Sequence, residues 1–268
     1  MDRNFLDDYF KMEREHWWFR VREGIILDQF KTSVYKGVPL QVLNVGAATG
    51  RSSEMLEPFG FVQSLEYDEP SYRFCHDVLK MKIDQGSITE LPYPDNAFDC
   101  VCAFDVVEHV EDHQKAISEL FRVCKPGGNI FITVPAFMSL WSNHDVVNHH
   151  FRRYRKNQLL KLFFPHRGRL IRTTYFNFFL FMPIFLVRSL QKIFTRTKQE
   201  ELKPDNDMIE SGFIKAVFQS IFSFERSLLR KINFPFGVSL LLLWEKNRSI
   251  DSAAMNSCCQ NEIVLFCF

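Results

Sequence analysis

The sequence predicts an α/β fold in which a mostly parallel sheet carries helices on both faces. Short, apolar, β-branched runs alternate with segments whose apolar residues recur at helical spacing. The first run ends on glycines in "VLNVGAATGR" (42–51), where a strand is expected to turn into a helix. Apolar residues make up 46% of the 268 positions, enough for one large core with an insertion.

Up to Pro135 the predicted elements alternate regularly. A helix with a break near Trp17 and Trp18 is expected over residues 4–30. Buried strands are predicted where short apolar runs meet glycine or polar residues, at 41–46, 61–68, 98–105 and 129–135. Helices are predicted between them, at 50–58, 70–80 and 111–124, and a turn at "KPGG" (125–128).

The second half of the chain has a different residue pattern from the first half. A polar, histidine-rich segment (141–156) precedes a predicted strand (168–176) and an apolar run, "YFNFFLFMPIFLV" (175–187). That run is too short for a membrane span, which needs roughly 20 apolar residues. It is interpreted as a core helix or pocket wall, or else as an interfacial helix. A helix at 213–231 and a buried strand at 236–244 follow.

The glycines after the first strand indicate a ligand that approaches the backbone closely. The nicotinamide fingerprint G-x-G-x-x-G is met only by Gly46, because Ala48 and Arg51 occupy its other positions. Glu66 ends the second strand, where a carboxylate can accept both hydroxyls of a ribose. The residues therefore predict a nucleoside site. The plainer alternative is that the glycines only turn the chain and Glu66 is a surface charge.

Further motifs in the sequence resemble those of a known enzyme family. With the glycine turn, the segments "LPYPDNAFD" (91–99), "EHV" (108–110) and "KPGG" (125–128) occur in order, so residues 41–135 resemble the class I S-adenosylmethionine-dependent methyltransferases. The resemblance is to the methyltransferase type 11 group. The segments "HWWFRVR" (16–22), "LWSNHD" (140–145) and "HFRRY" (150–154) resemble a bacterial subgroup of it.

The resemblance implies a Rossmann-like class I methyltransferase fold of seven mostly parallel strands. A helical, Phe-rich insertion at about 177–235 would precede an antiparallel last strand at about 237–245, near the sheet edge. The implied organisation is an N-terminal helical lid (1–36), a methyltransferase domain (37–245) and a C-terminal tail (246–268). Cys258 and Cys259, in that tail, receive no chemical role.

The family also implies a cofactor, S-adenosylmethionine, and its binding residues. The methionine half would lie along Gly46, Ala48 and Gly50, the ribose on Glu66, and the adenine beside Ser87 and Ile88. Phe104 and Asp105 would face the methionine amino group and the substrate mouth. The implied set also includes Asn44, Tyr67 and His109. Three positions depart from the family pattern: the family usually has Asp or Glu at 44, glycine at 48 and often aspartate at 87.

Methyl transfer requires mainly a nucleophile held in line with the methyl group, and a base only if that nucleophile is protonated. His144, Asp145 and His150 follow the fifth predicted strand, at the ligand edge of the sheet, and are the candidate catalytic residues. The plainer interpretation is that they cap and bridge a polar loop. His109 has one neighbouring glutamate, so no metal site is expected there.

The composition limits the classes of binding partner and the compartment that we expect for this protein. A net charge of +1 gives no argument for nucleic acid, and the seven scattered cysteines suit a reducing compartment without a zinc site. With no signal peptide in the charged N-terminus, a cytoplasmic protein is predicted. The expected acceptor is a small molecule, amphiphilic or linked to a lipid or glycan. Residues 175–194 are the candidate for peripheral membrane contact at the inner face; the oligomeric state is not predicted.

Two other functions stay open. A non-catalytic, nucleoside-binding regulatory module is kept open by Asn44, Ala48 and Ser87. A nicotinamide-dependent oxidoreductase is disfavoured by Arg51 and the missing third glycine.

Overall fold

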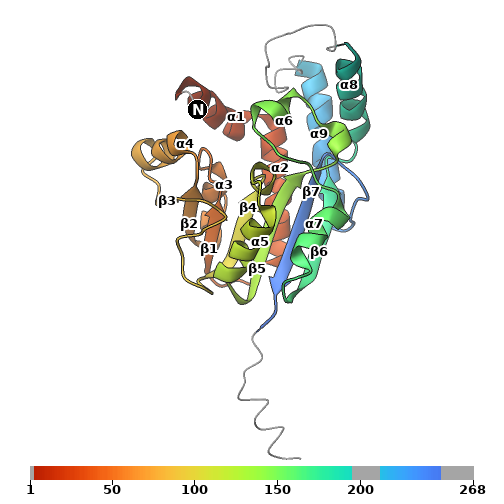
Figure 1. Ribbon diagram of the computed structural model, residues 1–268. Coiled ribbons are helices and arrows are strands. Elements are labelled where there is room, and N and C mark those ends of the chain that lie inside the picture. Colours follow the sequence, from red (N-terminus) through yellow and green to blue (C-terminus); the bar gives the residue numbers. More distant parts are fainter. Residues whose placement is uncertain (1–2, 195–211, 249–268) are drawn as a thin grey trace, which may run out of the picture.

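Seven strands form one sheet in the computed structural model, which describes residues 3–194 and 212–248 (Figure 1). The spatial order is β3-β2-β1-β4-β5-β7-β6. The first five strands pair in parallel, whereas β7 is antiparallel to both β5 and β6. The strands are β1 (Leu40–Val45), β2 (Gly60–Glu66), β3 (Ile83–Gln85), β4 (Phe98–Phe104), β5 (Cys124–Pro135), β6 (Gly168–Phe176) and β7 (Ser239–Lys246). The predicted mostly parallel sheet, with its antiparallel last strand near one edge, is confirmed.

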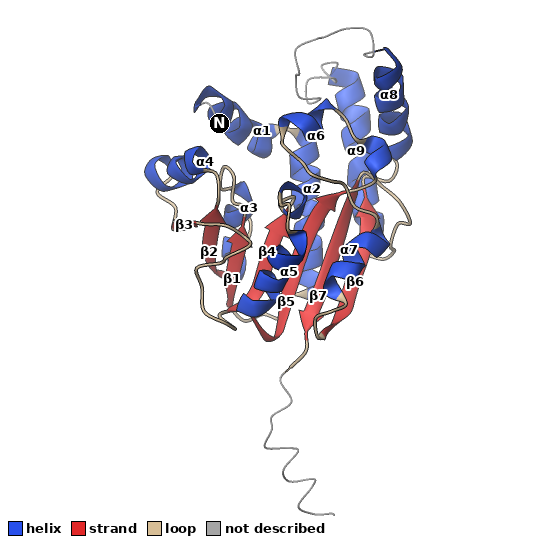
Figure 2. Ribbon diagram, in the orientation of Figure 1, coloured by secondary structure: helices blue, strands red, loops and turns tan. Residues whose placement is uncertain are grey.

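Helices cover both faces of the sheet (Figure 2). Helices α5 and α7 pack on one face, and α2 and α9 on the other. The helices are α1 (Arg3–Glu15), α2 (Trp17–Ser33), α3 (Arg51–Glu54), α4 (Glu69–Arg73), α5 (His113–Val123), α6 (Asn143–Val147), α7 (Lys156–Phe163), α8 (Phe181–Phe194) and α9 (Gly212–Leu229). Within the described residues, no helix combines the length and the apolar character that crossing a membrane requires.

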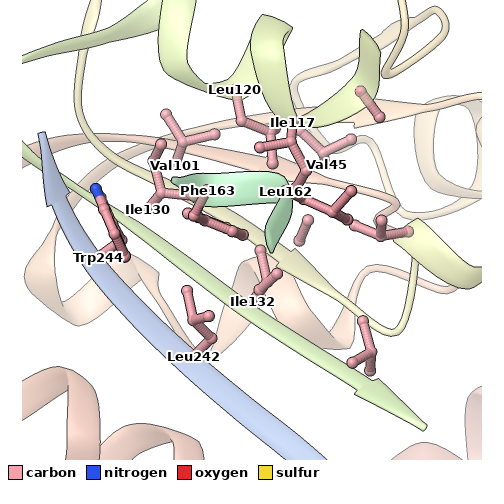
Figure 3. Packing of buried hydrophobic residues seen from close by; sticks show 14 of the residues in the cluster. Val45, Val101, Ile117, Leu120, Ile130, Ile132, Leu162, Phe163, Leu242 and Trp244 are labelled. Atoms are coloured by element: carbon pink, nitrogen blue, oxygen red, sulfur yellow. The ribbon is translucent and has the colours of Figure 1, made fainter. Parts of the chain in front are cut away.

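The core has two layers, one on each side of the sheet. Ile130 and Ile132 of β5 pack in the layer of α5 and α7, together with Phe163, which Figure 3 shows among the neighbouring apolar side chains. Phe131, between them in the sequence, packs in the other layer with Phe30 of α2. Successive side chains of a strand point to opposite faces, so a strand covered on both sides must be apolar throughout. This is why the strands were visible as continuous apolar runs.

Several predicted elements differ in detail from the structure. Strand β3 has only three residues and was not predicted, nor were helices α6 and α7. The helix predicted at 70–80 is α4 followed by a turn of π-helix (Phe74–Val78), and the one at 50–58 is α3 followed by a turn of 3₁₀-helix (Glu57–Phe59). The "KPGG" turn lies inside β5 as an irregularity, because the pairing partner of β4 jumps from Cys124 to Asn129.

Of the two N-terminal helices, α2 packs on one face of the sheet and α1 reaches a loop at the carboxyl edge. Helix α2 begins after His16, whose Nδ1 accepts a hydrogen bond from the Trp18 backbone, which explains the predicted break. Trp17 is 5% exposed and packs edge-on against Phe222 of α9. The predicted tail has its first residues at the end of β7, and Cys258 and Cys259 lie outside the described residues.

Candidate active site

The carboxyl ends of β1, β2 and β4 meet at one edge of the sheet. Their parallel register pairs Val45 with both Leu65 and Ala103. The residues that follow each strand therefore lie side by side, which places Gly46, Glu66 and Asp105 at the same edge. Ligands of open α/β sheets bind at this edge, where the connecting loops diverge.

The loop after β1 has a left-handed backbone at three positions. Gly46 has a φ of 74° and Gly50 a φ of 86°, and Ala48 lies between them with a φ of 49°. A Cβ atom at Gly46 would approach Val106 Cγ2 to 2.4 Å, so any side chain there would push the β4 loop away.

Glu66 holds this loop in place. Its Oε2 accepts a hydrogen bond from the Ala48 backbone N–H (2.8 Å), and its Oε1 accepts from the backbone N–H groups of Tyr67 and Asp68 (both 2.9 Å). Glu66 is 8% exposed. Burial raises the pKa of its carboxyl above the usual value, and these backbone hydrogen bonds oppose that rise.

Asp105 is fixed by two long-range partners. The Arg22 guanidinium donates to Asp105 Oδ2 (2.7 Å) and to Thr133 Oγ1 (3.1 Å), and the Thr133 hydroxyl donates to Asp105 Oδ1 (2.9 Å). Asp105 itself has a φ of 56°, a strained backbone for a residue with a side chain. These bonds hold together a residue of α2, a residue of β5 and the residue that directly follows β4 at the sheet edge.

Helix α1 lies over the glycine loop. Glu13 accepts a hydrogen bond from the Thr49 hydroxyl, and Arg14 forms an ion pair with Glu54 of α3. Arg14 also donates to the Thr49 carbonyl (3.4 Å). Burial raises the pKa of Glu13, although the bond with Thr49 opposes the rise. The N-terminal segment therefore covers the loop that the sequence assigned to the ligand.

The remaining residues predicted for the cofactor differ in exposure. Asn44 is fully buried and donates to the hydroxyls of Ser52 and Ser53 (2.8 Å each), so its side chain faces α3. Ile88 and Phe104 are also buried, at 5% and 8% exposure. In contrast, the Tyr67 ring is 75% exposed beside Glu66.

The predicted catalytic residues form a second group, after β5. Asp145 Oδ1 is 2.8 Å from His150 Nδ1, and the Arg153 guanidinium donates to both Asp145 oxygens (2.7 and 2.9 Å). Burial alone would raise the pKa of Asp145, but its bonds with His150 and Arg153 hold it well below the usual range. Asp145 also accepts from the Ser142 backbone N–H as part of a capping box on α6. The His144 ring centroid lies 6.0 Å from that of His150.

His109 belongs with this second group. It lies in the short turn Val107–His109 after β4, and its ring centroid is 4.5 Å from that of His150 at an interplanar angle of 87°. Although His109 is exposed to solvent, desolvation by the atoms packed around its ring and the nearby His150 lower its pKa to about 4, against the opposing charge of Asp105. The ring is therefore neutral at physiological pH. The influence of Asp105 on it links the two groups at the sheet edge.

Sequence reasoning missed several residues of this edge. Arg22 lies in the segment "HWWFRVR" and Arg153 in "HFRRY", but neither has a role predicted from the sequence, and no motif marks Glu13 or Thr133. Arg22 and Asp105 are 83 positions apart, so no local spacing indicated their contact. Glu108 was quoted within "EHV", and only the structure shows that it is fully buried.

Residues 43–132 match a family model described as a methyltransferase domain. A probable S-adenosylmethionine-dependent methyltransferase of Mycolicibacterium smegmatis is 29% identical over 126 residues, which are 46% of this chain and 48% of that protein. The ubiquinone/menaquinone biosynthesis C-methyltransferase UbiE of Cronobacter sakazakii is 36% identical over 69 residues, which are 25% of this chain and 28% of that protein. The chain thus spans about half the length, or less, of these curated relatives.

Solved structures share the fold. A SAM-dependent methyltransferase from Archaeoglobus fulgidus superposes with a TM-score of 0.54 at 18% identity. The match covers 91% of this chain and all of that one. The likeness therefore extends over both the sheet and the helices that flank it.

Proposed function

Because the chain carries a class I S-adenosylmethionine-dependent methyltransferase domain, we propose that it transfers a methyl group from S-adenosylmethionine to a small-molecule acceptor. The proposal rests on one observation. Glu66, Asp105 and the glycine loop meet at the same edge of the sheet, beneath α1. The cofactor's place follows from the family. The reaction of this chain is proposed from the histidine group after β5, and its acceptor from the exposed apolar side chains of α8 and α9.

The residues at the sheet edge fit this cofactor. A carboxylate offers about four acceptor positions, and three backbone N–H groups occupy those of Glu66, which leaves one for a ribose hydroxyl. The exposed Tyr67 ring beside it offers a face for a base. Arg22 Nε is buried without a hydrogen-bond partner, next to Asp105. A donor and a carboxylate so placed suit the carboxylate and ammonium groups of a methionine moiety.

When bound, S-adenosylmethionine supplies an electrophilic sulfonium methyl group, which an acceptor takes by in-line displacement to leave S-adenosylhomocysteine. The chain's own task is to hold the acceptor in line and to remove its proton where it has one. We assign the second task to the group of His144, Asp145 and His150. Asp145 fixes His150 through Nδ1, so Nε2 is the nitrogen through which His150 acts.

The acceptor is proposed to have an apolar part. Helix α8 exposes Met182 (53%) and Leu186 (54%), and α9 exposes Phe224 (60%). These helices form the insertion that precedes the last strand, which is where the chain departs from a bare cofactor-binding sheet. The UbiE relatives are named for quinone biosynthesis, and their similarity adds weight to an amphiphilic acceptor. Peripheral membrane contact of the same side chains remains the alternative use of this face.

Calorimetric titration with S-adenosylmethionine, S-adenosylhomocysteine and NAD tests the cofactor. We expect micromolar binding of the first two and none of NAD. Glu66→Ala should weaken that binding by at least about tenfold, since it removes a buried acceptor (about 1.4 kcal/mol per factor of ten). Exposed Glu69→Ala, on the next helix, is the control and should leave binding unchanged. Binding of NAD alone would support the oxidoreductase, and binding of none the regulatory module.

An acceptor screen with amphiphilic metabolites then tests the reaction. His150→Ala should lower kcat by about 100-fold or more with the dissociation constant for S-adenosylmethionine nearly unchanged. His149→Asn is the control, because asparagine tolerates the left-handed backbone (φ 55°) of that exposed neighbour. Equal losses of turnover and cofactor binding in His150→Ala would contradict a catalytic role.

A further inference from the structure

Three potential metal ligands from two loops converge beside the candidate active site. A carboxylate oxygen of Glu108 and a ring nitrogen each of His109 and His150 all lie within 4.8 Å of one another. Glu108 and His109 belong to the turn after β4, whereas His150 follows α6. The Phe151 backbone N–H donates to the Glu108 carbonyl (2.8 Å), so the main chain itself joins the two loops.

The Glu108 carboxyl group has no partner for its charge. Its side chain is fully buried, and neither oxygen accepts a hydrogen bond from another residue. A buried, unsatisfied carboxyl group costs folding free energy, and native proteins rarely keep one without a use. The charged groups that act on it are Asp105, which disfavours ionisation, and Arg22 and Arg153, which favour it but are both bonded to other carboxylates. A cation among the three donors would satisfy it.

Both imidazoles already have one nitrogen fixed. The Asp145 carboxylate holds Nδ1 of His150 at 2.8 Å, and the Asn148 backbone is hydrogen-bonded to the His109 ring. In metal-binding histidines, the nitrogen that does not bind the metal is usually hydrogen-bonded to a carboxylate or a carbonyl, which fixes the tautomer and the ring orientation. Arg153, bonded to both oxygens of Asp145, keeps that carboxylate in place in turn.

We propose that Glu108, His109 and His150 bind one divalent transition-metal ion, and that Zn²⁺ suits this donor set best. Two histidines and one glutamate form a known catalytic zinc ligand set, with a fourth position left for water or substrate. Metal–ligand bonds of about 2.1 Å separate tetrahedral donors by about 3.4 Å, so small side-chain movements would close the site. His109 is exposed, which gives an ion and an acceptor access from solvent.

The inference deepens the proposed function and rests on it for the ion's role. An acceptor oxygen or nitrogen at the fourth position would be held beside the cofactor edge, and the metal charge would lower its pKa. With the ion bound, His150 would hold the metal through its free nitrogen, and the proton lost by the acceptor would pass to solvent rather than to the imidazole. The sequence-based expectation of no metal considered only the glutamate next to His109 in the sequence, and His150 comes from 41 positions further along the chain.

Zn²⁺ and Co²⁺ titration of the tag-free, full-length chain tests the site. Cys258, Cys259 and Cys267 are replaced by serine in every protein, so that those thiols cannot bind the metal. We expect one Zn²⁺ per chain by calorimetry and visible Co²⁺ absorption typical of nitrogen and oxygen ligands. Glu108→Gln, His109→Ala and His150→Ala should each raise the dissociation constant by at least about tenfold.

His149→Asn is the matched control and should bind like the parent. Thermal unfolding by circular dichroism checks that each variant is folded, and Glu108→Gln keeps the shape of a side chain that has no partner to lose. No binding, or binding that Glu108→Gln leaves unchanged, would overturn the proposal, as would an equal loss in His149→Asn.

Titration of the same metal-free proteins with S-adenosylmethionine separates the two proposals. Cofactor binding without metal binding refutes the metal site and leaves the proposed function standing. Metal binding without cofactor binding leaves the site standing and refutes the proposed function, together with the acceptor role of the ion.

Discussion

Asn44 lies next to the last residue of β1 and Glu66 ends the neighbouring strand β2, yet their side chains contact different parts of the molecule. Asn44 is wholly buried and bonded to two serine hydroxyls at the start of α3, and its Oδ1 has no partner. Glu66 instead faces the glycine loop. At the residue scale, the first side chain stabilises a helix end, and the second organises the backbone that a ligand would approach.

This contrast predicts separate effects on stability and on binding. Asn44→Ala removes two buried hydrogen bonds and should lower the free energy of unfolding by about 2 kcal/mol. The dissociation constant for S-adenosylmethionine should change by less than about threefold, because the buried side chain is bonded to α3 rather than open to a ligand. Urea unfolding and calorimetry measure the two quantities. A large loss of binding in a fully stable variant would instead place Asn44 among the ligand contacts.

At the scale of elements, Glu225 joins α9 to the turn that precedes α8. Its Oε2 accepts from the backbone N–H groups of Phe178 (2.8 Å) and Phe179 (3.2 Å), and its Oε1 is buried without a partner. Burial raises the pKa of Glu225 to about 7, although these backbone bonds oppose the rise. The adjacent Asn177 is buried too, with a φ of 61°.

The raised pKa makes the joint sensitive to pH. The neutral carboxyl group favours the folded state, so its contribution is full below about pH 4.3, the unfolded value, and is lost as pH rises through about 7. Glu225→Gln should remove this dependence and raise the free energy of unfolding at pH 8 by up to about 3 kcal/mol. Urea unfolding from pH 5 to 8 measures it, with exposed Glu90→Gln as control. Parallel pH curves for the variant and the wild type would contradict the assignment.

Strands and helices could be predicted where the local residue pattern indicates them. Strands β1, β2 and β4 were placed within one or two residues, because each contains a short run of mainly apolar residues and is followed by, or ends at, a glycine or a carboxylate. Strand β3 was missed because its three residues, Ile83–Gln85, include only one buried side chain. The catalytic candidates His144, Asp145 and His150 lie together in the structure. Their proximity to Glu108 was not predicted, because a loop contact across 42 positions leaves no periodic trace.

At the scale of the whole molecule, α1 connects the N-terminus to the candidate active site. Arg14 bonds the carbonyls of Phe10 and Thr49 and pairs with Glu54, so one side chain ties α1 to the glycine loop and to α3. Arg14→Ala should speed the dissociation of S-adenosylhomocysteine by about tenfold, because α1 would no longer be tied to the glycine loop. This corresponds to a fall of about 1.4 kcal/mol in the activation free energy of dissociation. The stability of the sheet should stay within about 1 kcal/mol of the wild type.

Stopped-flow displacement measures this dissociation rate, and Lys11→Ala, exposed on the same helix, is the control. An unchanged rate in Arg14→Ala would mean that the helix does not limit ligand release.

The place of β7 has a consequence for synthesis on the ribosome. Strands β5 and β6 are not paired with each other; each pairs with β7, which lies between them. Until Ser239–Lys246 has left the exit tunnel, both strands carry a row of unpaired backbone groups next to apolar side chains. At about 5–20 residues per second, the interval from the end of β6 lasts several seconds. During that time a nascent chain can pair with another through these edges, so chaperone demand should peak just before the final strand emerges.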